Sequence, residues 1–255
     1  MEVLPAYTSV GTGPVKVLLL PGLFGAHQAF DAMLAHADRE RFQYVVMNYR
    51  GYGHARDVTG VYTLDEVVGD ALSLLDLLDW PTVHVGGHSI GALIAQKLAL
   101  AAPQRVRSVV SLAGMNARGA SRDPARVKML DDAAHDLDRR AALVDMGTGQ
   151  RHGMALARQV AESGWHAIAP AACAGYVADA ALTDISAEVA GSTLPVLVLV
   201  GAHDPGCSAA VARDTTLRWY PNATLEVFDE VGHYPMFEAP QRTLAVVEAF
   251  LRRLA

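Results

Sequence analysis

The sequence has little cysteine, few aromatic residues and no long uninterrupted apolar run. Its 255 residues include two cysteines, Cys173 and Cys207, and no C-x-x-C, H-E-x-x-H or clustered ligand spacing typical of a metal site. No apolar run reaches the roughly 18 residues that a transmembrane helix needs. Residues 1–5 are not a basic segment followed by an apolar one, as a secretion signal would be. We therefore expect two free thiols, no metal and a cytoplasmic location.

Positive charge is not in excess either. The chain has 21 Lys and Arg against 27 Asp and Glu, a formal net charge of −6, and the two signs are interspersed. This balance provides no basic patch for nucleic acid or for an anionic membrane surface. With 51% hydrophobic residues, the chain is long enough for one large domain with a sizeable core. We expect a small neutral or weakly charged molecule as its partner, no nucleic acid, no membrane, and a monomer or homodimer.

Short apolar runs alternate with helical patterns along most of the chain. Continuous apolar runs are typical of strands buried on both faces of a parallel sheet. Such runs occupy residues 15–20, 44–48, 83–85, 106–112, 195–200 and 224–228. The helical patterns occupy residues 29–37, 64–78, 90–101, 209–220 and 241–254. This alternation predicts an α/β fold with a doubly wound, mostly parallel sheet, to which residues 3–10 can add an antiparallel edge strand.

The alternation stops between residues 116 and 192, where no strand-like run occurs. Helical segments cover residues 125–144 and 154–163, with glycines at 147, 149 and 164. A helical insertion between two strands predicts a cap over the carboxyl edge of the sheet, where α/β proteins bind ligands. The expected organisation is a core domain of residues 1–115 and 193–255 and a helical cap of residues 116–192.

A glycine-bracketed serine stands between an apolar strand and a helix, in the sequence Gly87-His88-Ser89-Ile90-Gly91. A serine on a sharp strand-to-helix turn takes a strained backbone conformation that crowds the residues two before and two after it. Glycines at 87 and 91 relieve that crowding. The pattern predicts a nucleophile elbow, with Ser89 exposed as nucleophile and the amide of Ile90 pointing toward a developing oxyanion.

An acid and a base follow the next two strands. Asp204 lies just beyond the run at residues 195–200, and His233 follows the run at residues 224–228, so both are expected at the same sheet edge as Ser89. Their chain order, Ser, Asp, His, is the order of a triad in this architecture. A turn aspartate and an ordinary loop histidine are the alternatives, and His203 and Asp229 are the second choices as base and acid.

The loop after residue 20 is expected to supply the second oxyanion donor. The amide of Leu23 is the first choice and that of Phe24 the second, while a plain strand-to-helix turn is the alternative. As the strand before it is predicted to lie in the same sheet, this loop should reach the edge where Ser89 and Ile90 stand.

Aromatic residues of the core loops and the cap are the candidate substrate contacts. Phe24 and Phe237 are expected from the core loops, and Trp165 and Tyr176 from the cap. For the cap residues the alternative is packing within the cap itself, which apolar residues at helical spacing usually serve. The charged run at residues 131–140 is typical of a solvated helix face.

With these residues in place, the chain resembles enzymes of the α/β-hydrolase fold over essentially its whole length. The matching segments are Pro21-Gly22-Leu23-Phe24-Gly25, Tyr49-Arg50-Gly51-Tyr52-Gly53, Gly87-His88-Ser89-Ile90-Gly91, Gly201-Ala202-His203-Asp204, and Gly232-His233 with Glu238-Ala239-Pro240. The cap length and elbow are similar to those of 3-oxoadipate enol-lactonases and related small carboxylesterases. The resemblance implies a serine hydrolase with Ser89, Asp204 and His233 as its triad.

Two departures from the family pattern concern the substrate more than the fold. The oxyanion loop begins with Pro21-Gly22 where the family usually has His-Gly, and Asn48 stands before the R-G-x-G turn where the family usually has Asp. Serine at position 89 argues against dehalogenases and epoxide hydrolases, which resemble this fold but use an aspartate nucleophile.

The expected reaction is hydrolysis of a small carboxylic ester or lactone through an acyl-enzyme, with no cofactor. Three alternatives remain. A carbon–carbon bond hydrolase or lyase of the same fold would keep the triad, and a cofactor-free oxygenase would use mainly the His233–Asp204 pair. A ligand-binding receptor with a vestigial triad would show very slow turnover.

Overall fold

The computed structural model describes residues 5–254, and its strands form one seven-stranded sheet. The strands are β1 (Ala6–Val10), β2 (Val15–Leu20), β3 (Phe42–Asn48), β4 (Val83–His88), β5 (Val106–Leu112), β6 (Val196–Gly201) and β7 (Ala223–Phe228). Their order is β1-β3-β2-β4-β5-β6-β7, with β1 antiparallel to β3 and all other pairs parallel. The predicted fold class is therefore confirmed. Residues 3 and 4 of the predicted edge strand lie outside the described residues.

Burial along the strands follows their place in the sheet. Every residue of the central strands β4 and β6 is buried, whereas β1 and β7 at the two edges alternate between more and less exposed positions. A strand covered by helices on both faces favours apolar or small residues. Accordingly β6 consists of valine, leucine and glycine, whereas β4 combines valine and glycine with two buried histidines, His84 and His88.

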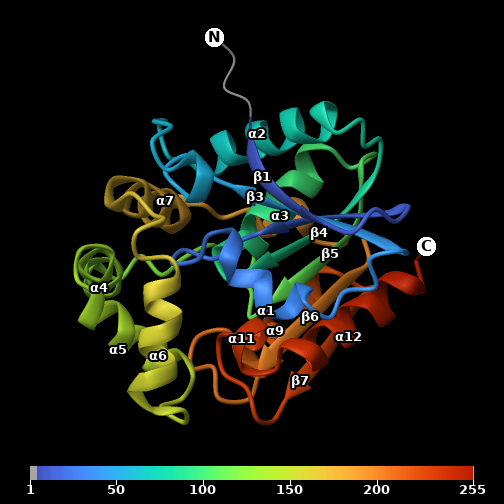
Figure 1. Ribbon diagram of the computed structural model, residues 1–255. Helices are drawn as coiled ribbons and strands as arrows, with labels where there is room; N and C mark the ends of the chain where they lie inside the picture. Colours follow the sequence, from blue (N-terminus) through green and yellow to red (C-terminus); the bar gives the residue numbers. More distant parts are fainter. Residues whose placement is uncertain (1–4, 255) are drawn as a thin grey trace.

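Helices cover both faces of the sheet (Figure 1), so the hydrophobic core lies in two layers that the sheet separates. On one face α2 (Leu64–Leu77) and α3 (Ile90–Ala101) pack on the strands, above the sheet in Figure 1. On the other face lie α1 (Asp31–Leu34), α11 (Pro235–Glu238) and α12 (Pro240–Arg252). Two predicted helices are shorter than expected: a 3-10 turn over His27–Phe30 precedes α1, and Thr215 separates α9 (Ala209–Asp214) from α10 (Thr216–Trp219).

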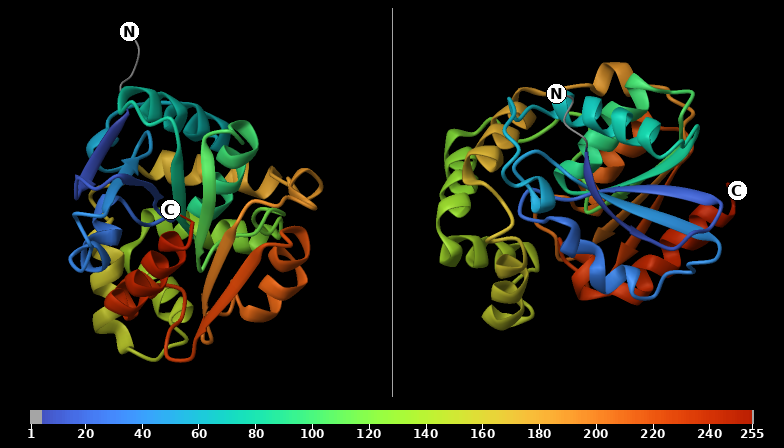
Figure 2. Two further views of the ribbon diagram at one scale, coloured as in Figure 1. Left: turned by 90° about the vertical axis from the view of Figure 1, so that its right-hand side faces the viewer. Right: turned by 45° about the horizontal axis from the view of Figure 1, so that its top comes forward.

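Five helices stand between β5 and β6, in the stretch predicted as a cap. They are α4 (Pro124–His135), α5 (Leu137–Gly147), α6 (Gly153–Ser163), α7 (Pro170–Leu182) and α8 (Ser186–Val189). The single helix predicted over residues 125–144 is divided, because the Asp136 side chain accepts hydrogen bonds from the amides of Asp138 and Arg139 and so caps α5. Helices α4 to α7 lie together at the left of the sheet in Figure 1 and in the right-hand view of Figure 2. Among residues 5–254, no helix combines the length and apolarity that crossing a bilayer requires.

The R-G-x-G turn holds the stretch of residues 116–192 that is predicted as a cap, and is called the cap below, through backbone hydrogen bonds. The amide of Gly53 donates to the carbonyl of Ala167 at 2.7 Å, and the amide of Ala169 donates to the carbonyl of Gly51 at 2.8 Å. Gly51 has a φ of +81°, and a Cβ on it would lie 2.3 Å from the Cβ of Ala172. Glycine at this position therefore lets the cap come close to the core.

Candidate active site

Loops that follow β2, β4, β6 and β7 bring seven of the nine predicted site residues to one cavity of about 390 Å³ at the carboxyl edge of the sheet. Ser89, Asp204 and His233 all line this cavity. So do the two predicted oxyanion residues and the two predicted aromatic contacts of the core loops: Leu23, Ile90, Phe24 and Phe237. The sheet thus gathers residues that stand more than 200 positions apart in the chain.

The turn at Ser89 has the strained geometry that the sequence predicts for an elbow. Ser89 has φ +52° and ψ −118°, outside the regions that L-residues prefer. A Cβ on Gly87 would lie 2.2 Å from the carbonyl carbon of Gly91, and a Cβ on Gly91 would lie 2.2 Å from the carbonyl oxygen of Leu20. Both flanking positions therefore require glycine for the strand and helix to meet at this angle.

Two backbone amides beside Ser89 are available to a ligand. Ile90 is the first residue of α3, where the N–H has no partner within the helix. Within residues 5–254, no hydrogen bond uses the N–H of Ile90 or of Leu23, whereas the N–H of Ser89 itself donates to Leu112 at 3.1 Å. A helix N-terminus also favours negative charge. The geometry is compatible with an oxyanion hole made by Leu23 and Ile90.

Asp204 and His233 form a short hydrogen bond. Nδ1 of His233 donates to Oδ2 of Asp204 at 2.6 Å, while Oδ1 of Asp204 accepts from the amides of Gly206 at 2.8 Å and Cys207 at 3.0 Å. Burial alone would raise the pKa of Asp204, but the charge and hydrogen bond of His233, with the two amides, hold it below its ordinary value. Burial alone would lower the pKa of His233, but Asp204 outweighs it and raises that pKa.

His88 has a role that the sequence did not reveal. Its Nε2 donates to the carbonyl oxygen of His233 at 2.8 Å, and the two imidazole rings lie 5.0 Å apart. Burial, with the nearby His233, lowers the pKa of His88 to about 3, so the ring is neutral and its one N–H is used in this bond. The residue before Ser89 thus anchors the loop that carries His233.

Tyr176 does not reach the cavity, contrary to its prediction as a substrate contact. It is buried, its hydroxyl donates to the carbonyl of Arg50 at 3.0 Å, and its ring packs edge-on against Tyr49 and Tyr52. Tyr176 packs between cap and core, because it faces the R-G-x-G turn and not the elbow, so it is neither a cavity residue nor, as the alternative had it, part of a core within the cap itself.

Trp165 is also absent from the residues that line the cavity. The guanidinium of Arg140 lies over the ring of Trp165 at 4.6 Å and over the ring of Phe24 at 4.7 Å. Arg140 is 1% exposed and its Nε donates to the carbonyl of Ala133 at 3.0 Å, so the predicted solvated face of residues 131–140 is wrong at its last position. A cation of the cap thus lies against Phe24, next to the predicted oxyanion donor.

Cap residues that do line the cavity come from single faces of four helices. They are Arg126 and Leu130 on α4, Leu143, Met146 and Gly147 on α5, Val160 and Ser163 on α6, and Val177 and Ala180 on α7. Spacings of three and four residues put these positions on one side of each helix. Helical periodicity can predict an apolar face on each of these helices, but it does not indicate which face lines the cavity.

One group of side chains in the site also has the donor set of a metal ligand cluster. Asp204, Cys207 and His233 offer an oxygen, a sulfur and a nitrogen within 4.8 Å of one another. Such donors suit zinc. The 2.6 Å bond between Asp204 and His233 is equally the arrangement in which an aspartate orients a catalytic imidazole.

Comparisons with known proteins agree with this architecture. A family model described as alpha/beta hydrolase fold matches residues 16–240. Over 97% of its length the chain is 24% identical to 3-oxoadipate enol-lactonase 2 of Acinetobacter baylyi, and it covers 92% of that protein. It is 29% identical to 2-hydroxymuconate semialdehyde hydrolase of Pseudomonas putida, over 98% of this chain and 88% of the relative.

A solved structure has the same fold. The enol-lactonase from Burkholderia xenovorans LB400 superposes with a TM-score of 0.83, covering 97% of this chain and 96% of that chain. The two sequences are 22% identical, so this likeness concerns the fold.

Proposed function

Because the chain belongs to the alpha/beta hydrolase fold family, we propose that it is a serine hydrolase that cleaves a small carboxylic ester or lactone. The observation that carries the proposal is the Asp204–His233 hydrogen bond on the same cavity as Ser89, which stands at the strained turn. Such a nucleophile, base and acid at one sheet edge are what acyl transfer requires.

In the proposed reaction Ser89 Oγ attacks the carbonyl carbon of the substrate while His233 Nε2 takes its proton. The amides of Leu23 and Ile90 bind the oxyanion that forms. Collapse of this intermediate breaks the bond to the alcohol oxygen, which leaves with the proton from His233, and Ser89 stays acylated. Water then attacks the acyl group with His233 again as base, and the carboxylic acid is released. Asp204 holds the ring tautomer and stabilises the imidazolium.

The size of the cavity and the chemistry of relatives support a small acyl substrate. The volume of about 390 Å³ is at the low end for small-molecule sites, and most of the wall is apolar. One relative that the chain matches over nearly its full length is an enol-lactonase, and the reaction of such an enzyme opens an ester bond within a ring.

The test is hydrolysis of a panel of p-nitrophenyl esters and small lactones by the wild type and Ser89→Ala. Removing the nucleophile is expected to lower kcat by about 10⁴- to 10⁶-fold. Ser73→Ala is the matched control, since Ser73 lies on α2 and its hydroxyl bonds only the carbonyl of Gly69. Ester turnover that survives Ser89→Ala would contradict the proposal.

Carbon–carbon bond hydrolysis is the second candidate. It is favoured by the identity of 29% to a 2-hydroxymuconate semialdehyde hydrolase over almost the whole chain. Such a reaction would use the same three residues, and assays with a ring-cleavage dienoate beside the esters distinguish the two. A dienoate kcat/KM far above that of every ester and lactone would favour this candidate. Turnover by the His233–Asp204 pair without Ser89 would instead favour the cofactor-free oxygenase chemistry.

A further inference from the structure

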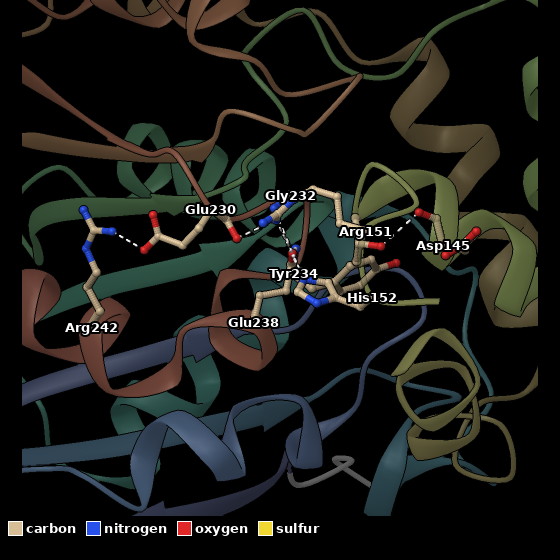
Figure 3. Close-up of polar contacts among 9 residues, drawn as sticks. Asp145, Arg151, His152, Glu230, Gly232, Tyr234, Glu238 and Arg242 are labelled. Carbon is tan, nitrogen blue, oxygen red and sulfur yellow. Dashed lines mark hydrogen bonds and ion pairs between the residues drawn. The ribbon is translucent and has the colours of Figure 1, made fainter. Parts of the chain in front are cut away.

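A buried carboxylate lies beneath the loop that carries His233. Glu238, the last residue of α11, has a side chain that is 0% exposed. Its oxygens accept from the amide of Gly232 at 3.0 Å and from the amide of Tyr234 at 3.0 Å (Figure 3). These are the residues immediately before and after His233, so one carboxylate fixes the backbone on both sides of the proposed base.

Two side chains of the cap face this carboxylate. Nε2 of His152 lies 3.0 Å from Oε2 of Glu238, and Nη1 of Arg151 lies 4.0 Å from the same oxygen. Arg151 also donates to the carbonyl of Glu230 at 2.6 Å, and the Glu230 side chain pairs with Arg242 (Figure 3). A buried carboxylate is costly without a partner, and leaving it unpaired would weaken its hold on the loop.

The backbone of the cap turn at residues 147–152, which carries Arg151 and His152, also contacts His233 directly. The amide of His233 donates to the carbonyl of Gly147 at 2.9 Å. The fit is close, because a Cβ on Gly147 would lie 3.2 Å from the Cβ of His233, and a Cβ on Gly232 would lie 2.4 Å from the Gly147 oxygen. The base is thus held from the elbow by His88 at its carbonyl and from the cap at its amide.

We propose that the cap turn of residues 147–152 positions His233, with His152 and Arg151 acting through Glu238. The proposal rests on the proposed function, since it concerns the base of that reaction. His152 and Arg151 are positioning residues that touch neither substrate nor reacting atoms: they keep Glu238 in place, and Glu238 fixes the amides on either side of His233. The cap is then part of the catalytic machinery as well as a wall of the cavity.

The first test separates kcat from KM with p-nitrophenyl acetate as substrate. His152→Ala is expected to lower kcat about 10-fold, with KM within about 2-fold of the wild type, because a small displacement of a catalytic group slows the chemical step. His152→Gln keeps an N–H donor near Glu238 and should recover most of the loss. Arg151→Ala is expected to lower kcat by a smaller factor, as its guanidinium is more distant from Glu238.

Matched controls come from the cap itself. His135 on α4 is exposed and faces Asp131, and Arg158 on α6 pairs with Asp138 of the cap. Replacing either by Ala should leave kcat and KM unchanged. In the double variant His152→Ala with Glu238→Gln, kcat should equal that of Glu238→Gln alone, because both changes act on one path. If the two single losses in kcat multiply in the double variant, the proposal is wrong. It is also wrong if His152→Ala raises KM and leaves kcat unchanged.

A second measurement does not depend on turnover. Hydrogen exchange of the backbone amides in residues 228–238 should be faster in His152→Ala than in the wild type, and unchanged in His135→Ala. If the wild type hydrolyses no ester, lactone or dienoate, the proposed function fails, and exchange alone then decides whether the cap turn holds this loop. Equal exchange in His152→Ala and the wild type would show that it does not.

Discussion

The edge of the sheet and the cap place residues around the same cavity by different means. At the sheet edge, Asp204 and His233 follow two paired parallel strands, whose last pair joins Gly201 of β6 to Phe228 of β7. The cap reaches these loops through individual contacts instead, such as the Gly147 carbonyl on the amide of His233 and the Arg140 guanidinium on the Phe24 ring. The proposed reacting groups are thus placed by the sheet, whereas the cap contacts the loops that carry them.

The largest effect is expected where the sheet edge itself is changed, in Asp204→Asn. The oxygen of Asn can keep the bonds from the amides of Gly206 and Cys207, but its NH₂ group would then face Nδ1 of His233. This favours the tautomer with a proton on Nε2, which cannot accept the proton of Ser89. We expect kcat to fall by about 10⁴-fold, or about 5.4 kcal/mol in the barrier, measured with the best ester of the panel.

The pH profile of the same variant has a definite sign. As the proposed base, His233 must be neutral in the wild type, and Asp204 raises its pKa, so we expect kcat/KM to fall as the pH drops through that raised pKa. Without the carboxylate, burial is the main remaining influence and lowers the pKa, so the acidic limb should move to lower pH. Asp229→Asn is the control, as Asp229 is exposed. A larger loss in Asp229→Asn than in Asp204→Asn would show that the acid is assigned to the wrong residue.

The sheet edge was accessible to sequence reasoning because its determinants are local. The strain at Ser89 requires small residues at two fixed positions, and glycines at 87 and 91 meet that demand in the sequence itself. A buried parallel strand is a continuous apolar run, so the residue that follows it is placed at a known edge. Asp204 and His233 could therefore be brought together without knowledge of any side-chain contact.

The cap was less predictable because its contacts depend on which surfaces meet. Arg140 is a charged residue on a charged helix, and its burial against the rings of Phe24 and Trp165 follows from tertiary packing alone. Tyr176 lies in a helix rich in alanine, where the weak contrast between faces does not indicate whether the ring points to the cavity or to the core. The division into core and cap at residues 116 and 192 stays a prediction.

A smaller effect is expected where the cap meets the predicted oxyanion loop, in Arg140→Lys. Lysine keeps the charge but loses the planar group that lies over two rings and the bond from Nε to Ala133. We expect the free energy of unfolding to fall by about 1–2 kcal/mol, which thermal unfolding can measure. The neighbouring Arg139→Lys is the control and should change it by less than about 0.5 kcal/mol, since Arg139 is exposed. Equal losses in the two variants would contradict the role assigned to the buried guanidinium.

The smallest effect, and the sharpest test of the comparison, is expected for Gly147 at the start of the cap turn, compared with Gly153 just after its end. In Gly147→Ala the new methyl group would lie 3.2 Å from His233 Cβ, so the loop must shift by a few tenths of an ångström, and kcat is expected to fall about 3-fold. Gly153 has φ +68° and open space around it, so Gly153→Ala should cost about 1 kcal/mol of stability through backbone strain and leave kcat unchanged. The kcat of Gly147→Ala is measured by steady-state kinetics, and the stability of Gly153→Ala is measured by thermal unfolding. If Gly147→Ala lowered stability without lowering kcat, the cap turn would be only a structural neighbour of His233, and the cap would have no part in positioning the base.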